Sequence, residues 1–424
     1  MAAGKGVQRP WSELPGDLLA AVYRCCSSAH DRLRFAAVCT SWCAVASWHR
    51  PLPALPLLLT LPSPSTGDHD AAWAYSPEDG RAVRVPLPWA VTPGTCLVGF
   101  HDGGWIAATC ASRGHGQQLL VVNSFSGVEV ALTANPRVVE YAWLYAVDAG
   151  FIPTNAWRAI KKVVFSDDPS SDRCIVAAIT KWGNLALCRI GRPEAGWTTQ
   201  GCGTGAYGDL MDIAFCGGEH HGLSRNNRKL FLYGVSCTKL FMYEVAVNED
   251  GDAPTIAMVH TISDLKASIP NIYKQWPKRI FELHGKVAIA VEFCEWPDLC
   301  SYFKVYELAE CDERTQYQYK LAEVTSLGDH ALFLSPACSK AVRMPATGGQ
   351  RGGVKRNCIY HPKQYSPPFE GEHYMQRLNL GSCAVYFSDN RHNMHQMGRI
   401  ISQVYHYRDE DDSNGCMWFL PPDF

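Results

Sequence analysis

Apolar residues near the start of the chain recur at the spacing of an α-helix. Measured from Leu14, they fall four, five, eight, nine and twelve positions further on, at Leu18, Leu19, Val22, Tyr23 and Cys26. This spacing places them in a single stripe along one helix. Pro15 fits the first turn, where its missing N–H costs nothing, and Ser12 is a candidate N-cap or N-terminal flank.

A second helical pattern begins after the segment SSAHD, and Asp31 is a candidate cap for it. The apolar side chains that share one face of this run are Phe35, Val38, Cys39, Trp42 and Ala46. A break near Cys39 would divide the run into two short helices. The pattern therefore predicts a small all-α unit of three short helices over residues 8–50.

After residue 67 the period of the pattern changes to two. Val128, Val130 and Leu132 alternate with Glu129, Ala131 and Thr133, as along a half-buried strand. Hairpins are predicted where two β-forming runs flank a turn, at residues 173–191, 229–247 and 286–310. Strand pairs return roughly every forty to fifty residues, the length of a four-stranded blade.

We therefore predict a mostly β, propeller-like domain of six or seven blades over residues 67–424. The alternative is a pair of β-sandwiches or another large all-β fold. The pattern alone gives the propeller a slight preference.

The segment between these two parts, residues 51–66, begins with PLPALPLLLTLP. Its apolar run is shorter than the ~20 residues that a membrane-spanning helix needs. Its four prolines would also break a helix. We expect a stiff, extended connector packed on a domain surface, and no membrane anchor.

Composition narrows the classes of partner. The chain has 39 Lys and Arg against 41 Asp and Glu, a formal net charge of −2. This balance provides no overall field that would favour nucleic acid or an anionic membrane, so neither is an expected partner.

The 18 cysteines occur without a signal segment or an N-x-S/T site. We expect a reduced protein of the cytoplasm or nucleus, with its cysteines used as small buried apolar residues. Cys174, Cys188, Cys202 and Cys216 recur every fourteen positions, as in a β-meander that returns to one layer.

The chain contains short motifs that resemble metal-binding or nucleotide-binding sites, but the sequence around each one does not match what such a site needs. Metal binding has little support because the chain has no C-x-x-C pair. Gly203–Gly208 match G-x-G-x-x-G, but a strand pattern follows where a dinucleotide site needs a helix. The acidic run at 407–415 lacks the Gly and carboxylate positions of an EF-hand, and the histidine clusters lack H-E-x-x-H spacing. We therefore expect no catalytic residues, no metal and no cofactor, in a chain that is not an enzyme.

The helical unit presents an energetic problem. A unit of ~40 residues seldom buries enough surface to be stable alone. Fully burying each large aliphatic side chain is worth roughly 1.5–3 kcal/mol. Because Leu18 and Leu19 are adjacent, they widen the apolar stripe beyond what one small core can cover. The cover is either the chain's own β-domain or a separate helical protein.

The run WSELPGDLLAAVY…DRLRFAAVCTSWCAVA resembles an F-box, the module through which substrate receptors join SCF ubiquitin ligases. This resemblance implies that part of the unit contacts a Skp-family adaptor, which connects to cullin and RING subunits. The residues implied in the contact are Leu14, Pro15, Leu18, Leu19, Val22, Val38, Cys39 and Trp42.

Segments across residues 99–424, among them KKVVFSDDPSSDRCIVAAI and SLGDHALFLS, are similar to a plant F-box family with a kelch-like propeller, the KIB-type proteins. The resemblance implies a substrate-recognition subunit whose β-domain binds a protein target for ubiquitination. Two alternatives stay open: a ligand-binding or catalytic propeller with a self-docked helical cap, and an F-box scaffold that acts outside a ligase.

Overall fold

The computed structural model of the chain describes most of the helical unit and the strands of the β-domain. The described residues are 11–26, 29–49, 54–61, 72–78, 80–85, 95–112, 116–130, 132, 160–180, 184–192, 195–200, 210–217, 230–247, 253–269, 277–295, 300–310, 319–344, 350–351, 354–362, 393–397, 400–405 and 416–421.

The N-terminal part contains the three expected short helices. A single 3-10 turn, η1 (Trp11–Glu13), precedes α1 (Gly16–Cys25), and α2 (Ala29–Ala36) and α3 (Thr40–Trp48) follow. The predicted break near Cys39 is confirmed, because Cys39 is the extended residue that caps α3. The predicted capping role of Asp31 is wrong. Helix α2 already begins at Ala29, so the Asp31 carboxylate lies in its first turn, where the helix dipole favours a negative charge.

The rest of the described chain is mostly strands, which form four-stranded units. The first sheet has the order β27 (Cys416–Phe419), β1 (Leu57–Thr60), β2 (Ala72–Ser76) and β3 (Arg81–Val85). The next unit runs from β4 (Cys96–His101) through β5 (Trp105–Ser112) and β6 (Gly116–Asn123) to β7 (Glu129–Val130). It is joined to β8 (Ile160–Phe165), β9 (Ile175–Thr180), β10 (Leu185–Arg189) and β11 (Thr198–Gln200) by a parallel bridge between Gly99 and Val163.

Two further four-stranded sheets follow in chain order. One consists of β12 (Leu210–Phe215), β13 (Leu230–Ser236), β14 (Lys239–Ala246) and β15 (Thr255–Asp264), and a short helix, α5 (Leu265–Ser268), comes after it. The other consists of β16 (Lys278–Leu283), β17 (Lys286–Glu295), β18 (Cys300–Glu310) and β19 (Tyr319–Val324).

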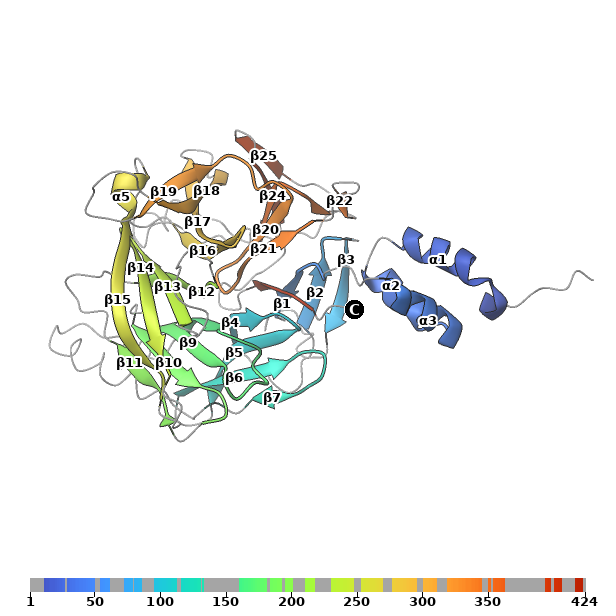
Figure 1. Cartoon of the computed structure of the whole chain (residues 1–424), viewed down its shortest axis with the longest axis horizontal. Coiled ribbons are helices and arrows are strands. Elements are labelled where there is room, and N and C mark those ends of the chain that lie inside the picture. Colours follow the sequence, from blue (N-terminus) through green and yellow to red (C-terminus); the bar gives the residue numbers. More distant parts are fainter. Residues whose placement is uncertain are drawn as a thin grey trace, which may run out of the picture.

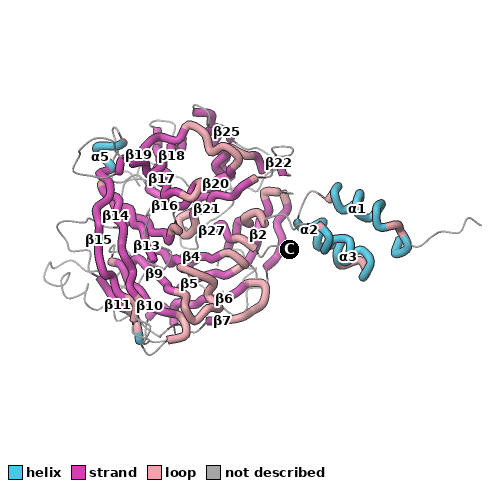
Figure 2. Tube along the Cα trace, viewed as in Figure 1, coloured by secondary structure: helices cyan, strands magenta, loops and turns pink. Residues whose placement is uncertain are grey.

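The last sheet has the order β21 (Ser339–Arg343), β20 (His330–Leu334), β24 (Cys358–Pro362), β26 (Ile400–Tyr405) and β25 (Asn393–Met397). Strands β22 (Gln350–Arg351) and β23 (Val354–Lys355) form a separate pair. Figure 1 and Figure 2 show the sheets following one another around a common centre, with the helices to one side. This is the radial arrangement of a β-propeller and not that of two stacked sandwiches.

The ring closes through strands from opposite ends of the described chain. Strand β27 pairs antiparallel with β1, with Leu57 opposite Phe419 and Thr60 opposite Cys416. The indole of Trp418 is fully buried and donates a 3.0 Å hydrogen bond to the Leu334 carbonyl of the neighbouring sheet. The structure therefore places Leu57–Thr60, which we expected in the surface connector, inside the first sheet.

The predicted hairpins are present. Residues 173–191 form the antiparallel pair β9–β10, residues 229–247 form β13–β14, and residues 286–310 form β17–β18. The segment after the glycine motif is strand β12, as expected. The glycine motif itself, the acidic run at 407–415, and His220 and His221 lie outside the described residues. The blade number, six or seven, stays a prediction.

Several cysteines of the described β-domain are buried, as expected, whereas Cys96 and Cys237 are half-buried. The expectation that the regularly spaced cysteines share one layer is wrong, because Cys174 and Cys188 are buried in one hydrophobic cluster and Cys216 is buried in a different one. Burial raises the pKa of the Cys174 thiol to about 11, so it stays protonated near neutral pH. Cys202 lies outside the described residues. Within the described helices, no segment is long and apolar enough to cross a bilayer.

Candidate functional site

The three helices have a hydrophobic core of their own. Its fully buried members are Leu19, Tyr23, Phe35 and Val45, and Leu14, Cys26 and Trp42 are among the side chains packed around them. The Tyr23 and Phe35 rings meet edge to face with centroids 5.2 Å apart. In the described part of the chain, this cluster contains no residue of the β-domain. The helices therefore shield their core with one another's side chains.

Three of the residues implied in adaptor contact are exposed apolar side chains. Leu18 and Val22 are 53% and 40% exposed, and Val38 is 54% exposed. Leu18 and Val22 are four residues apart on α1, so they lie one above the other on the same helix face. Exposed aliphatic side chains on one helix face form a surface that a partner helix could cover.

Leu19 is not part of this surface. Its side chain is only 1% exposed and packs in the core of the helical unit. Consecutive residues of a helix point about 100° apart, which directs Leu18 outward and Leu19 inward. The role implied for Leu19 is therefore corrected from direct contact to packing, and the argument that this adjacent pair cannot share one small core is confirmed.

Of the other implied residues, Pro15 is exposed and three lie between core and surface. Pro15 is exposed directly before α1, and Leu14 is half-buried against the core. Cys39 is half-buried, with its Sγ 3.1 Å from the Ser41 hydroxyl. The indole of Trp42 is half-buried and donates a 3.2 Å hydrogen bond to the Trp11 carbonyl. Sequence reasoning did not single out Trp11 and Trp48, which are the most exposed large apolar side chains of the unit.

A buried ion pair lies at the centre of the β-domain, and the sequence did not predict it. The Asp212 carboxylate on β12 is fully buried, and Oδ1 lies 2.5 Å from Nζ of Lys162 on β8. Oδ2 accepts a 2.9 Å hydrogen bond from the backbone N–H of Ile280 on β16. One carboxylate thus joins strands of three successive four-stranded units. The signal in the sequence was a charged residue inside each of the apolar runs IKKVVF and LMDIAF.

A further lysine is buried close to this centre. Lys278, the first residue of β16, is fully buried, and its Nζ lies 3.7 Å from Sδ of Met211. Burial lowers the pKa of Lys278 to about 8, from an ordinary value of 10.5. The folded protein therefore destabilises the charged form of this amine.

Replacing Lys278 by Met is expected to make the free energy of unfolding less dependent on pH between 8 and 10.5. The burial penalty is fully present below pH 8, where the amine is charged in both the folded and the unfolded state. It disappears as pH rises from 8 to 10.5, because only the unfolded state then holds the proton. Between pH 7 and pH 10.5 the wild type should gain on the order of 3 kcal/mol in free energy of unfolding relative to this variant. Chemical denaturation at both pH values measures it.

The control is Lys266→Met, because Lys266 on α5 is exposed. This variant should change the free energy of unfolding little. The burial penalty would be contradicted if the free energy of unfolding of Lys278→Met changed with pH in the same way as that of the wild type does.

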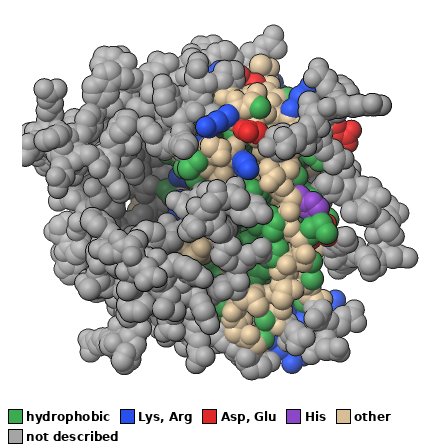
Figure 3. Space-filling view, turned by 90° about the vertical axis from the view of Figure 1, so that its left-hand side faces the viewer, with side chains coloured by type: hydrophobic (Ala, Val, Ile, Leu, Met, Phe, Trp, Pro, Cys, Tyr) green, Lys and Arg blue, Asp and Glu red, His purple; other side chains and the backbone are tan. Residues whose placement is uncertain are grey.

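The described side chains on one face of the β-domain are of mixed chemical types (Figure 3). Strand β15 lies on the side of the ring away from the helices (Figure 1), and Met258 on this strand is 52% exposed. Figure 3 shows that side, with hydrophobic side chains beside lysines, arginines and a few acidic groups.

The fold defines a β-propeller with an appended helical unit. Residues 74–395, three quarters of the chain, match the KIB1-4 beta-propeller family. The chain therefore belongs to this family, which confirms the resemblance of its β-domain to KIB-type propellers. No curated protein matches the chain.

Several solved structures are distantly similar. AofleA from Arthrobotrys oligospora has 11% identity and a TM-score of 0.29, over 65% of this chain and 68% of that one. A putative 6-phosphogluconolactonase from Bacteroides uniformis has 12% identity and a TM-score of 0.27, over 63% and 81%. Hsv2p of Kluyveromyces lactis has 12% identity and a TM-score of 0.28, over 64% and 73%.

Proposed function

We propose that this protein is the substrate-recognition subunit of an SCF-type ubiquitin ligase. In this proposal the helical unit is an F-box that binds a Skp-family adaptor, and the propeller binds a target protein. The observation that supports it most is the exposed apolar face of Leu18 and Val22 on a unit that already has its own core. Such a face lowers its free energy when another protein covers it.

The arrangement of the chain suits a receptor. In Figure 1 the helices lie beside the ring, so a partner on the helices leaves most of the propeller surface free for a target. The mechanism would be proximity: holding the target near the charged E2 raises the effective concentration of its lysines. The receptor itself then needs no acid, base or nucleophile.

The alternative of a self-docked helical cap makes a different prediction about burial. In a cap, strands of the β-domain would cover the exposed stripe of α1. Leu18 is more than half exposed, and Leu19 is covered by the helices themselves. These two observations favour an external partner over a cap.

Co-expression of the full chain with a Skp-family adaptor tests the proposal. We expect the two proteins to co-purify as a stable complex by size-exclusion chromatography, and cullin to join when it is added. If no adaptor co-purifies with a folded chain, the receptor proposal fails. If an adaptor binds but cullin never joins, the chain is instead an F-box scaffold outside a ligase.

A further inference from the structure

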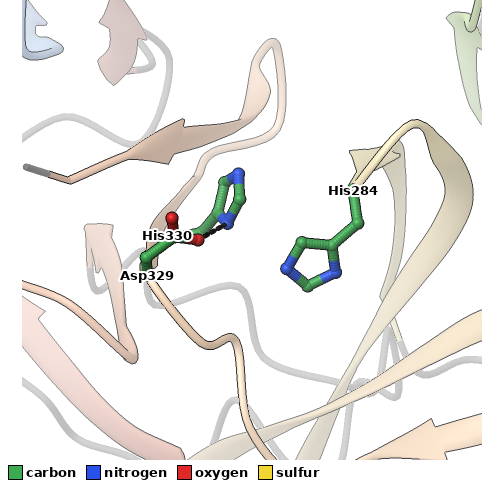
Figure 4. Close-up of side chains that lie close together, drawn as sticks. All are labelled: His284, Asp329 and His330. Atoms are coloured by element: carbon green, nitrogen blue, oxygen red, sulfur yellow. Dashed lines mark ion pairs between the residues drawn. The ribbon is translucent and has the colours of Figure 1, made fainter. Parts of the chain in front are cut away.

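Two histidines and an aspartate meet where two sheets of the β-domain adjoin. His284 lies in the turn between β16 and β17, and Asp329 and His330 lie at the start of β20. One potential ligand atom from each residue lies within 4.8 Å of the other two. The His284 and His330 rings are nearly perpendicular, with centroids 4.7 Å apart. Figure 4 shows the His284 ring directed toward the other two side chains.

His284 and Asp329 each bond to a charged residue outside the cluster, and each keeps one potential ligand atom directed toward the cluster. Nδ1 of His284 lies 2.9 Å from the Glu307 carboxylate on β18, which fixes the tautomer with the lone pair on Nε2. Oδ2 of Asp329 accepts a 2.7 Å hydrogen bond from Nε of Arg343, so Oδ1 stays directed toward His330. Outer carboxylates and charged donors of this kind orient the ligands of metal sites.

The third residue has a buried nitrogen that lacks a well-aligned partner. Nδ1 of His330 is 2.9 Å from Oδ1 of Asp329, yet among the described residues it forms no hydrogen bond of acceptable geometry.

The loop that carries Asp329 and His330 is firmly positioned. The Asn357 side chain accepts a 2.8 Å hydrogen bond from the Leu327 N–H, and the Asn357 N–H donates a 2.7 Å bond to the His330 carbonyl. His284 itself has a left-handed backbone, with φ of 52°. This φ is explained by the hairpin, because His284 and Gly285 (φ 75°) form the two-residue turn between β16 and β17, and such a turn has positive φ at both residues.

We propose that His284, Asp329 and His330 bind a divalent transition-metal ion of the zinc type. Two imidazoles and one carboxylate are the ligands that Zn²⁺ accepts, whereas Mg²⁺ and Ca²⁺ prefer oxygen alone. Tetrahedral ligation at about 2.0–2.2 Å would place the three ligand atoms roughly 3.3 Å from one another. Oδ1 of Asp329 and Nδ1 of His330, now 2.9 Å apart, would separate slightly, and the His284 ring would move inward. The exposed His284 ring can make that small movement. The ion would link the β16–β17 turn to the neighbouring sheet and would keep a fourth position open for water or a partner's side chain.

Titration of the full-length chain with Co²⁺ and Zn²⁺ tests this site. Co²⁺ should give the visible absorption of a tetrahedral nitrogen- and oxygen-ligated ion, and Zn²⁺ should displace it. His284→Ala and Asp329→Ala should each weaken binding at least about tenfold, and Glu307→Gln should weaken it by about 10- to 100-fold through the orientation of His284. His330→Ala should act likewise. Circular dichroism checks that each variant is folded.

The matched control is His260→Ala, which removes another histidine that pairs with a glutamate, Glu244, at 3.2 Å in a different sheet. It should leave metal affinity unchanged. The proposal is overturned if His284→Ala and Glu307→Gln, both at partly exposed positions, bind Co²⁺ as the wild type does. It is also overturned if the bound Co²⁺ shows thiolate charge-transfer absorption, because the ion then sits on the chain's cysteines.

Discussion

Replacing both Leu18 and Val22 with aspartate should reduce adaptor binding by on the order of 100-fold or more while the chain stays folded. Both side chains are largely exposed on one face of α1, so the substitutions leave the helix core of Leu19, Tyr23, Phe35 and Val45 unchanged. Burying each aliphatic side chain against a partner is worth roughly 1.5–3 kcal/mol, and burying a carboxylate there adds a further penalty. Calorimetric titration with a purified Skp-family adaptor measures the loss.

The matched control for this variant is Val128→Asp, which places the same charge at an exposed valine of the β-domain. It should bind the adaptor as the wild type does. The thermal unfolding of both variants should match that of the wild type. Wild-type affinity in the double aspartate variant would show that α1 does not form the adaptor surface.

Replacing Asp212 by Ala should destabilise the β-domain by about 3–5 kcal/mol, the usual cost of leaving one charge of a buried pair alone. The Lys162 ammonium would lose its partner at 2.5 Å, and the Ile280 N–H would lose its acceptor. Because these groups come from three successive four-stranded units, the loss should lower the cooperativity as well as the midpoint of unfolding. Denaturant titration followed by tryptophan fluorescence measures both quantities.

Two comparison variants separate the buried pair from pairs at the surface. Lys304→Ala breaks a partly exposed pair with Glu323 and should cost no more than about 1 kcal/mol. The double variant Lys162→Met with Asp212→Leu removes both charges and should recover much of the stability lost in Asp212→Ala. If Asp212→Ala unfolds at the wild-type denaturant concentration, the pair does not hold the ring together.

The sequence predicted the local elements well because their signals are local. The stripe from Leu14 to Cys26 and the break at Cys39 depend on neighbours within one or two helical turns, and the structure contains the helices they predict. Hairpins such as β9–β10 likewise pair residues a few positions apart. The resemblance to KIB-type proteins then supported the prediction that these strands form a propeller.

Features that depend on distant residues were not predicted. Leu57–Thr60 look like part of a proline-rich connector until β27 pairs with them, and that partner lies at the other end of the described chain. The burial of Lys162 was equally hidden, because its partner Asp212 is fifty residues away. The same reason applies to His284 and His330, which no spacing motif connects. Only the fold shows which charges and imidazoles meet.

The pairing of β27 with β1 also determines when the ring can be completed on the ribosome. Strand β1 leaves the exit tunnel early, but the strand that neighbours it emerges after all the other described strands. Throughout translation the growing propeller therefore has an unpaired β1 edge, with Leu58 and Leu59 lacking the neighbour that later covers them. Nascent chains of this protein should consequently benefit from chaperones until β27 has left the tunnel and paired with β1.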